Sequence, residues 1–286
     1  MKKILLLGGY GFLGSNLISY LKKENHLTLL VKRKTPYPKN TDLKNIQTLY
    51  VEENKLEETL KGNNFDVIIN CMVKYDYNSG RNEIYESNIY LPFKILNILY
   101  HKEIIFITFN SFYTKFDNYN KLPFYQFSKT ELENKLLKFS SKSISLKIEH
   151  LYGPNDNEIK FIPKILNSLK NNKNEISLTS GIQKRDFIYI SDLSNLINQI
   201  ILNSDKFPDG YSEYEIGTGK SIILKTFINE LKIQTKSKSI LAFGKKKYEN
   251  NEIMDSFASI AKIQKIIPWK PQINFKKGIE LLIKNS

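Results

Sequence analysis

Cysteine, histidine and long apolar runs are scarce in this chain, and each absence excludes a class of protein. Cys71 is the single cysteine among 286 residues, so no internal disulfide can form, and three scattered histidines give no basis for a metal centre. No apolar run approaches the roughly 18–20 residues of a membrane span. The apolar stretch near the N-terminus covers only residues 4–7, so a signal peptide is not expected. We therefore expect a cytoplasmic protein that contacts neither a metal nor a membrane.

The chain is strongly basic, with a formal net charge of +14. Such an excess could attract nucleic acid or a phosphorylated ligand. The lysines are spread along the whole sequence, however, so most of them are expected on the solvated surface and nucleic-acid binding is not expected. The hydrophobic content of 41% and the charged content of 25% are ordinary for a globular protein of one large or two small domains.

Glycines cluster at the N-terminus, between an expected buried strand and an expected helix. Residues 4–7 are a short apolar run, Gly8, Gly11 and Gly14 follow at G-x-x-G-x-x-G spacing, and a helical apolar pattern begins at Ser15. Glycines let the backbone approach a pyrophosphate, and a helix N-terminus supplies N–H groups and positive dipole. This context predicts a dinucleotide-binding loop, with a tight turn that binds nothing as the simpler alternative.

The next segments alternate between strand and helix. Apolar runs predict strands at 27–31, 46–51, 65–71 and 103–108, and helical patterns separate them at 56–60 and 84–99. Such alternation predicts an α/β fold with a doubly wound parallel sheet of the Rossmann type. The second strand ends in Lys32-Arg33-Lys34 with no acidic residue, which favours NADP(H) over NAD(H), and Glu52 or Glu53 could receive the adenine amino group.

A tyrosine and a lysine follow the fifth expected strand. Tyr125 and Lys129 are four residues apart at the start of a helical pattern, so they share one face. A phenol beside an ammonium group has a lowered pKa, because the positive charge favours the phenolate. Alcohol–ketone interconversion needs such an acid/base group near neutral pH. The spacing alone is a weak motif, and its place after a glycine loop strengthens it.

Taken together, these motifs resemble the extended short-chain dehydrogenase/reductases, a family of nucleotide-sugar epimerases, dehydratases and reductases. The resemblance covers essentially the whole chain and includes family-like segments at 151–154, 181–192, 215–219 and 268–271. The sequence between Phe106 and Lys129 looks most like the CDP-abequose/paratose synthases, which reduce a 4-keto sugar with NADPH. The resemblance implies an NADP(H)-dependent ketoreductase of a CDP-linked deoxysugar, with Tyr125 as proton donor.

The resemblance also implies individual roles. Cofactor contacts are implied for Gly8, Gly11, Phe12, Leu13, Gly14, Lys32, Arg33, Glu52, Cys71, Met72 and Lys129. Contacts with the nucleotide sugar are implied for Asn88, His150 and Arg185, where the planar guanidinium of Arg185 suits a diphosphate.

The chain departs from the family pattern beside its tyrosine motif. Phe109 stands where the family has a hydroxyl that bonds the reacting carbonyl, so Ser111 or Thr108 must take that role. We prefer Ser111, because the family's dehydratases place a catalytic acid there. Asn110-Ser111 replaces the acidic pair of those dehydratases, and neither can donate as a carboxylic acid, so dehydration is disfavoured. His150 replaces an asparagine, either as an altered substrate contact or as a satisfied histidine at a strand end.

We expect two domains. Residues 1–152 and 182–204 would form the NADP-binding Rossmann domain, and residues 153–181 and 205–286 a smaller C-terminal α/β domain for the nucleotide sugar. The resemblance suggests a homodimer joined by the helices after the fourth and fifth strands. Two alternatives stay open: a C4 epimerase that holds NAD tightly, and a non-catalytic NADP(H)-binding regulator.

Overall fold

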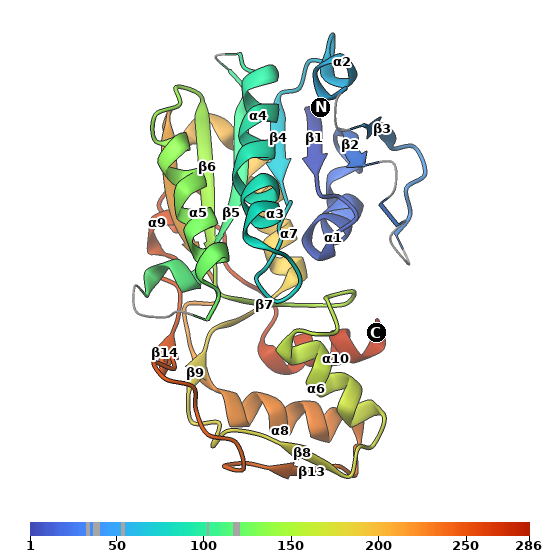
Figure 1. Ribbon diagram of the computed structural model, residues 1–286, viewed down its shortest axis with the longest axis vertical. Coiled ribbons are helices and arrows are strands. Elements are labelled where there is room, and N and C mark those ends of the chain that lie inside the picture. The colour runs from blue at the N-terminus through green and yellow to red at the C-terminus, as the bar shows by residue number, and fades with distance from the viewer. Residues whose placement is uncertain (33–34, 37–40, 53–54, 102, 117–120) are drawn as a thin grey trace. The chain divides into compact units, whose positions relative to one another are not determined.

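The structure is a computed structural model, which describes residues 1–32, 35–36, 41–52, 55–101, 103–116 and 121–286 (Figure 1). The chain divides into two compact units. The first unit consists of Met1–Lys147, Ser194–Tyr214 and Lys262–Trp269, and the second of Ile148–Leu193, Glu215–Ala261 and Lys270–Ser286. Among the described residues, no helix is both long enough and apolar enough to cross a membrane.

A parallel sheet forms the centre of the first unit, which confirms the expected doubly wound fold. Over the described residues it has seven strands in the order β3-β2-β1-β4-β5-β6-β11. These strands are β1 (Lys3–Leu7), β2 (His26–Lys32), β3 (Gln47–Val51), β4 (Val67–Asn70), β5 (Ile105–Ser111), β6 (Lys142–Ile148) and β11 (Tyr211–Ile216). The strand order reverses between β1 and β4, and ligands of such sheets bind outside the carboxyl ends at this switch point.

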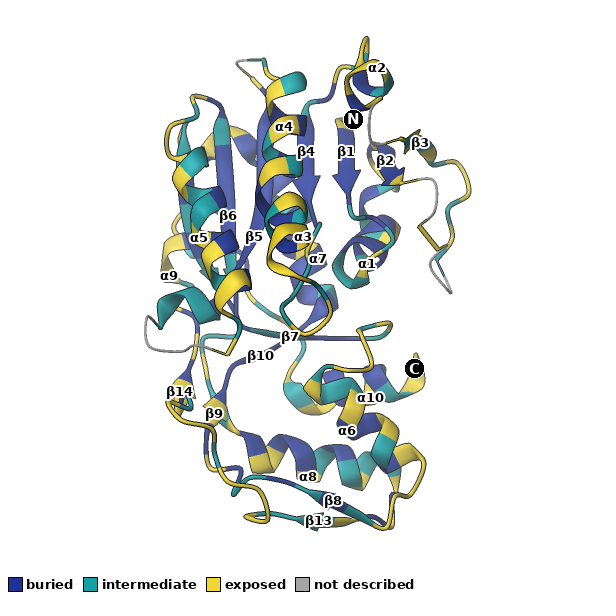
Figure 2. Ribbon diagram, in the orientation of Figure 1, coloured by how far each residue is buried: buried dark blue, intermediate teal, exposed yellow. Residues whose placement is uncertain are grey.

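The strands β1, β2 and β4 are buried because helices cover the sheet, which is why their sequences are almost continuously apolar. Ile4, Leu5, Leu6 and Leu7 in β1 are all 0% exposed. In Figure 2 the sheet strands are largely dark blue, whereas α4 and α5 carry yellow outer faces. The helices associated with this unit are α1 (Phe12–Leu21), α2 (Leu56–Leu60), α3 (Arg81–Tyr85), α4 (Leu91–Ile98), α5 (Pro123–Leu136), α7 (Ile190–Leu202) and α9 (Ala261–Gln264).

The helix after β4 contains a widened turn. A π-type turn over Glu86–Tyr90 joins α3 to α4, and the Leu91 N–H bonds the Glu86 carbonyl five residues back. Pro92 follows, and a proline has no N–H to donate and clashes with the carbonyl four residues before it. The wide turn accommodates that proline and carries Asn88 into the interior, where it is 1% exposed.

The second unit is built from short strands, which form two pairs and one three-stranded sheet, and from three longer helices. The strands are β7 (His150–Tyr152), β8 (Glu175–Ser177), β9 (Lys184–Arg185), β10 (Phe187–Tyr189), β12 (Ile222–Ile223), β13 (Ile240–Ala242) and β14 (Asp255–Ser256), and the helices are α6 (Phe161–Lys170), α8 (Leu224–Thr235) and α10 (Phe275–Lys284). Aromatic rings fill its core: Phe187 stacks on Phe227 with centroids 4.0 Å apart, and Tyr152 meets both edge to face.

The units divide the chain at other residues than we expected. The first boundary falls after Lys147 rather than after residue 152. Residues 182–193 belong to the second unit, because β9 pairs there with β12 and β14, and β10 with β7. Residues 205–214 belong to the first unit, because β11 lies beside β6 at the sheet edge. Strand pairing between distant segments, which apolar periodicity does not reveal, sets these boundaries.

Candidate active site

The glycine loop lies against the end of β4. Gly8 has a φ of +70°, and a Cβ on Gly8 would lie 2.8 Å from the Cys71 carbonyl carbon. A Cβ on Gly14 would collide with the Gly8 carbonyl oxygen, so glycine is required at both positions. Gly11 is the N-cap residue of helix α1, and no side chain at that position caps the helix. This leaves a helix N-terminus that fits a pyrophosphate.

The residues expected near the adenosine lie at the same edge of the sheet. Lys32 is the last residue of β2 and pairs in register with Val51, which Glu52 follows directly. Arg33 lies outside the described residues. Cys71 follows β4, and its N–H donates to the Leu7 carbonyl at 3.0 Å. Apart from Lys129, which lies on α5, the expected cofactor residues that are described therefore end or follow β1, β2, β3 and β4.

Cys71 and Met72 connect the loop to the sheet. Cys71 is buried, and burial raises the pKa of its thiol, so it stays neutral. The Met72 N–H donates to the Asn70 side-chain oxygen at 3.2 Å, which fixes the turn after β4. The neutral thiol and the methionine give this stretch an apolar lining, as expected of residues that pack along a cofactor.

Tyr125 and Lys129 lie together on α5, as the spacing predicted. The Lys129 Nζ is 5.6 Å from the centroid of the Tyr125 ring, and both side chains are buried, at 6% and 5% exposure. The Nζ donates to the Phe109 carbonyl of β5 at 2.8 Å, which fixes the ammonium group in place. Burial lowers the pKa of Lys129 to about 8, and the negative charge of Glu133 opposes that shift.

The two candidate hydroxyls occupy different positions on β5. Thr108 pairs with Asn70 inside the sheet, and its Oγ1 accepts the Asn70 amide at 3.2 Å. Ser111 is the last residue of β5, at the carboxyl edge where ligands of parallel sheets bind. Its Oγ accepts the Tyr113 N–H at 3.4 Å, a long bond that leaves the hydroxyl proton able to donate. This position favours Ser111, and its role stays a prediction.

The side-chain amide of Asn88 forms hydrogen bonds within the protein. Its Oδ1 accepts the Lys74 N–H at 2.8 Å, and its Nδ2 donates to the Lys74 carbonyl at 3.0 Å and to the Ser128 hydroxyl at 2.9 Å. These bonds occupy the side-chain amide, so Asn88 joins the loop after β4 to helix α5. The expected contact between Asn88 and a substrate stays a prediction.

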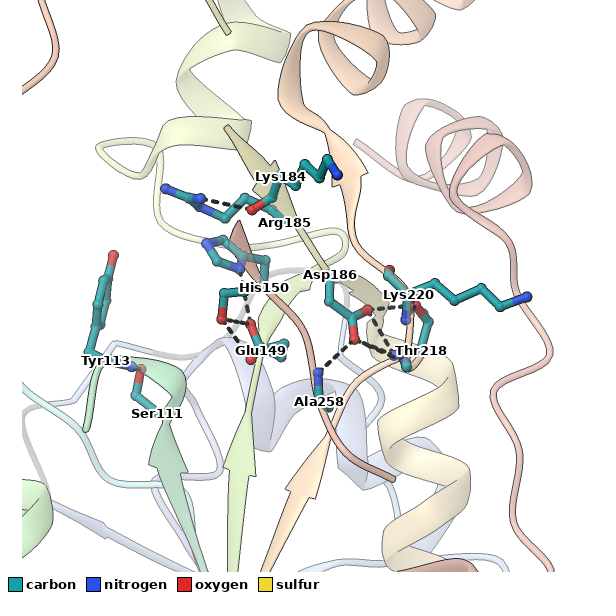
Figure 3. A network of polar contacts seen from close by, with 12 residues as sticks. Ser111, Tyr113, Glu149, His150, Lys184, Arg185, Asp186, Thr218, Lys220 and Ala258 are labelled. Carbon is teal, nitrogen blue, oxygen red and sulfur yellow. Dashed lines mark hydrogen bonds and ion pairs between the residues drawn. The ribbon is translucent and has the colours of Figure 1, made fainter. Parts of the chain in front are cut away.

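The second unit contains His150 and Arg185. Arg185 is 7% exposed, its Nη1 donates to the Lys184 carbonyl at 2.8 Å, and its Nη2 pairs with Glu252 at 2.5 Å. The His150 Nδ1 lies 3.6 Å from a carboxylate oxygen of Glu149, which is 4% exposed (Figure 3). The guanidinium that we expected to grip a diphosphate therefore already has an acidic partner in this unit.

Asp186 explains two of the family-like segments. Its carboxylate accepts the Thr218 N–H at 2.8 Å, the Gly219 N–H at 3.0 Å and the Ala258 N–H at 3.2 Å, together with the Thr218 hydroxyl (Figure 3). Burial raises the pKa of this carboxyl, and the donors oppose that shift. A Cβ on Gly217 would collide with the carboxylate. The segments at 181–192 and 215–219 thus meet in one buried contact, and our sequence reasoning gave Asp186 no role.

Three further residues were missed. Asp76 and Tyr75, in the loop after β4, contact the first turn of α5, and Glu133 follows Lys129 by one helical turn. The sequence before α5 showed only that a local cap is missing, because Leu122 has no capping side chain, and it gave no indication of Asp76.

Comparison with known proteins agrees with this architecture. Residues 4–217 match the model of the NAD dependent epimerase/dehydratase family, and the chain belongs to that family. It is therefore an enzyme of the extended short-chain dehydrogenase/reductase type, as the motifs indicated. The chain is 31% identical to a CDP-abequose synthase of Salmonella typhimurium, an alignment that covers 98% of this chain and 97% of that one.

Solved structures share the fold. A UDP-glucose 4-epimerase of Thermotoga maritima, solved with UDP-glucose, superposes with a TM-score of 0.83 at 17% identity and covers 99% of this chain and 98% of its own. A dTDP-glucose 4,6-dehydratase of Bacillus anthracis, solved with NAD, has a TM-score of 0.81 at 17% identity, with 99% and 96% covered. At this identity the likeness establishes the fold alone.

Proposed function

We propose that the protein reduces the 4-keto group of a CDP-linked deoxy or dideoxy sugar with NADPH. The observation that supports the proposal is the buried pair of Tyr125 and Lys129 on the helix that follows β5 of a Rossmann sheet, with the Lys129 Nζ 5.6 Å from the centroid of the Tyr125 ring. Full-length similarity to a CDP-abequose synthase supports the substrate class. The coarser assignment, a dehydrogenase/reductase acting on a nucleotide sugar, needs only the family and this pair.

The residues of the first unit fit a pyridine dinucleotide. The glycine loop leaves no room for a Cβ at Gly8 or Gly14, and the start of α1 has no capping side chain, which suits a pyrophosphate. Lys32 at the end of β2 supports a 2′-phosphate and so favours NADP(H). NADPH, when bound, supplies the hydride that adds to the carbonyl carbon.

The chain's own groups handle the proton. Tyr125 donates its phenolic proton to the carbonyl oxygen as that oxygen gains negative charge, so the product is an alcohol. The Lys129 ammonium group stabilises the phenolate that Tyr125 becomes. The Ser111 hydroxyl holds the developing alkoxide with a hydrogen bond. In this proposal, Arg185 and His150 bind the nucleotide sugar.

The test is turnover by purified protein. With a CDP-4-keto-dideoxyhexose, NADPH should be consumed stoichiometrically, and NADH should be used less well. Tyr125→Phe should lower kcat by roughly 10³-fold or more while leaving the Kd for NADPH nearly unchanged, because it removes the proton donor alone. A Tyr125→Phe protein that keeps wild-type turnover would contradict the assignment.

A C4 epimerase is the second candidate, because the family model that the chain matches names epimerases. An epimerase retains NAD through its cycle, so the protein would purify with a bound dinucleotide and would convert a sugar nucleotide without consuming NADPH. The basic end of β2 favours an exchangeable NADPH. A binding protein without turnover is disfavoured, because both members of the Tyr125–Lys129 pair are present and adjacent.

A further inference from the structure

The first turn of α5 carries Tyr125, and its sequence cannot satisfy its own N–H groups. Pro123 begins the helix without an N–H, and Gln126 donates to the Leu122 carbonyl at 2.9 Å. The two N–H groups between them, of Phe124 and Tyr125, have no acceptor within the helix, and Leu122 has no capping side chain. An uncapped first turn frays easily, and here it would move the tyrosine with it.

Asp76 supplies both missing acceptors from the loop after β4. Its Oδ1 accepts the Phe124 N–H at 3.1 Å, and its Oδ2 accepts the Tyr125 N–H at 2.9 Å. Each carboxylate oxygen thus accepts one of the two N–H groups that have no acceptor within the helix. The negative charge also lies at the positive end of the helix dipole, which strengthens the cap.

The neighbouring residue fixes the ring of Tyr125. Tyr75 stacks on it, with ring centroids 4.7 Å apart and an interplanar angle of 29°. Tyr75 also stacks on Tyr77, with ring centroids 5.0 Å apart. The Tyr125 ring therefore has Tyr75 as a stacking partner and the Lys129 ammonium group 5.6 Å from its centroid.

The loop is itself anchored to the same helix. Asn88 holds both the N–H and the carbonyl of Lys74 and donates to the Ser128 hydroxyl. Ser128 in turn donates to the Tyr125 carbonyl at 2.7 Å. The loop is therefore bonded to α5 at two points, through Asp76 to the Tyr125 N–H and through Lys74 and Asn88 to Ser128. The loop cannot shift without moving the start of α5.

We propose that Tyr75 and Asp76 are positioning residues that hold Tyr125 in its reactive orientation. The inference rests on the proposed function, in which Tyr125 is the proton donor. A proton donor must meet the carbonyl oxygen at hydrogen-bond distance, and a misplacement of about 1 Å can cost about 100-fold in rate. The cap fixes the backbone of Tyr125, and the stack fixes its ring.

Steady-state kinetics test the two residues separately. Asp76→Ala removes both acceptors and should lower kcat by about 10- to 100-fold while KM for both substrates stays within about twofold. Asp76→Asn keeps one acceptor oxygen, so its kcat should lie between that of the wild type and that of Asp76→Ala. Tyr75→Leu should lower kcat by about 10-fold, and Tyr75→Phe, which keeps the ring, should restore it.

Asp66→Asn is the matched control. Asp66 also accepts a backbone N–H, that of Lys3 at 2.6 Å, but it precedes β4 and lies at the opposite end of that strand. The control makes the same change of charge and should leave kcat unchanged. If Asp66→Asn lowers kcat as much as Asp76→Asn does, or if Asp76→Ala keeps the wild-type kcat, the inference is overturned.

Hydrogen exchange gives a readout that needs no turnover. In Asp76→Ala the amides of Phe124 and Tyr125 should exchange at least about tenfold faster, while the Kd for NADPH stays unchanged because the glycine loop is intact. If the wild type reduces no keto-sugar nucleotide, the proposed function fails. The exchange rates of the Phe124 and Tyr125 amides then test on their own whether Asp76 holds the start of α5 in place. Unchanged exchange at these two amides would overturn the inference.

Discussion

Replacement of Lys129 by methionine should abolish turnover and change how stability depends on pH. Burial lowers the pKa of Lys129 to about 8, whereas an exposed lysine has a pKa of 10.5. The difference corresponds to roughly 3 kcal/mol, because a tenfold change in proton affinity is about 1.4 kcal/mol. Keeping this cation in the folded protein at neutral pH therefore lowers the free energy of unfolding by roughly that amount.

The sign of the pH effect follows from proton binding. Between pH 8 and 10.5 the unfolded chain holds a proton on Lys129 that the folded protein has released. The unfolded state binds more protons there, so the free energy of unfolding of the wild type rises with pH relative to the variant. Below that window both states are protonated and the difference is constant. Near neutral pH the difference in free energy of unfolding between the two proteins is small, because two effects of Lys129→Met oppose each other. The substitution removes the buried cation, but it also deprives the Phe109 carbonyl of its donor, at a cost of about 1–3 kcal/mol.

The assay is urea unfolding of both proteins without coenzyme, from about pH 7 to about pH 10. Across this range the wild type should gain about 2–3 kcal/mol over Lys129→Met. In parallel, kcat of the wild type should decline at a pH at or above about 8, because a neutral amine no longer favours the Tyr125 phenolate. A difference in unfolding free energy that stays constant over the whole range would refute the reasoning.

Two further predictions concern the charges around this pair and the coenzyme. Glu133→Gln removes a charge that raises the pKa of Lys129, so the alkaline decline in kcat should move to lower pH, while Glu131→Gln on the same helix, whose partner is Lys135, should leave it in place. The pH profile of kcat measures this, and identical profiles for Glu133→Gln and the wild type would contradict it. Lys32→Ala should raise KM for NADPH by about 5- to 10-fold and leave KM for NADH unchanged, because it removes one cation from the expected 2′-phosphate site. Equal losses with both coenzymes would count against NADP(H) selectivity at Lys32.

Much of the fold could be predicted, because the decisive information is local. Strands such as β1 and β4 are buried on both faces, so their apolar runs are continuous and easily found. The glycine spacing indicates the turn, since Gly8 and Gly14 have no room for a Cβ. Tyr125 and Lys129 lie within one helical turn, so their spacing alone predicted that they are neighbours.

The support around that pair could not be predicted, because it joins distant segments. Asp76 caps a helix that begins 47 positions later, since α5 starts at Pro123. Arg185 matched a phosphate-binding position, yet its guanidinium pairs with Glu252, 67 positions away. Nothing in the residues around Arg185 indicates that partner, and the same holds for the strand pairing that sets the boundaries of the two units.

The sequence by itself determined the class of fold, the tight glycine loop and the proximity of Tyr125 and Lys129, because each depends on residues within a turn or two of one another. Tertiary structure alone decided how buried Lys129 is, and therefore its lowered pKa. It also decided which loop holds Tyr125 in place. Burial and long-range hydrogen bonds arise only when segments far apart in the chain pack together, and no local pattern encodes them.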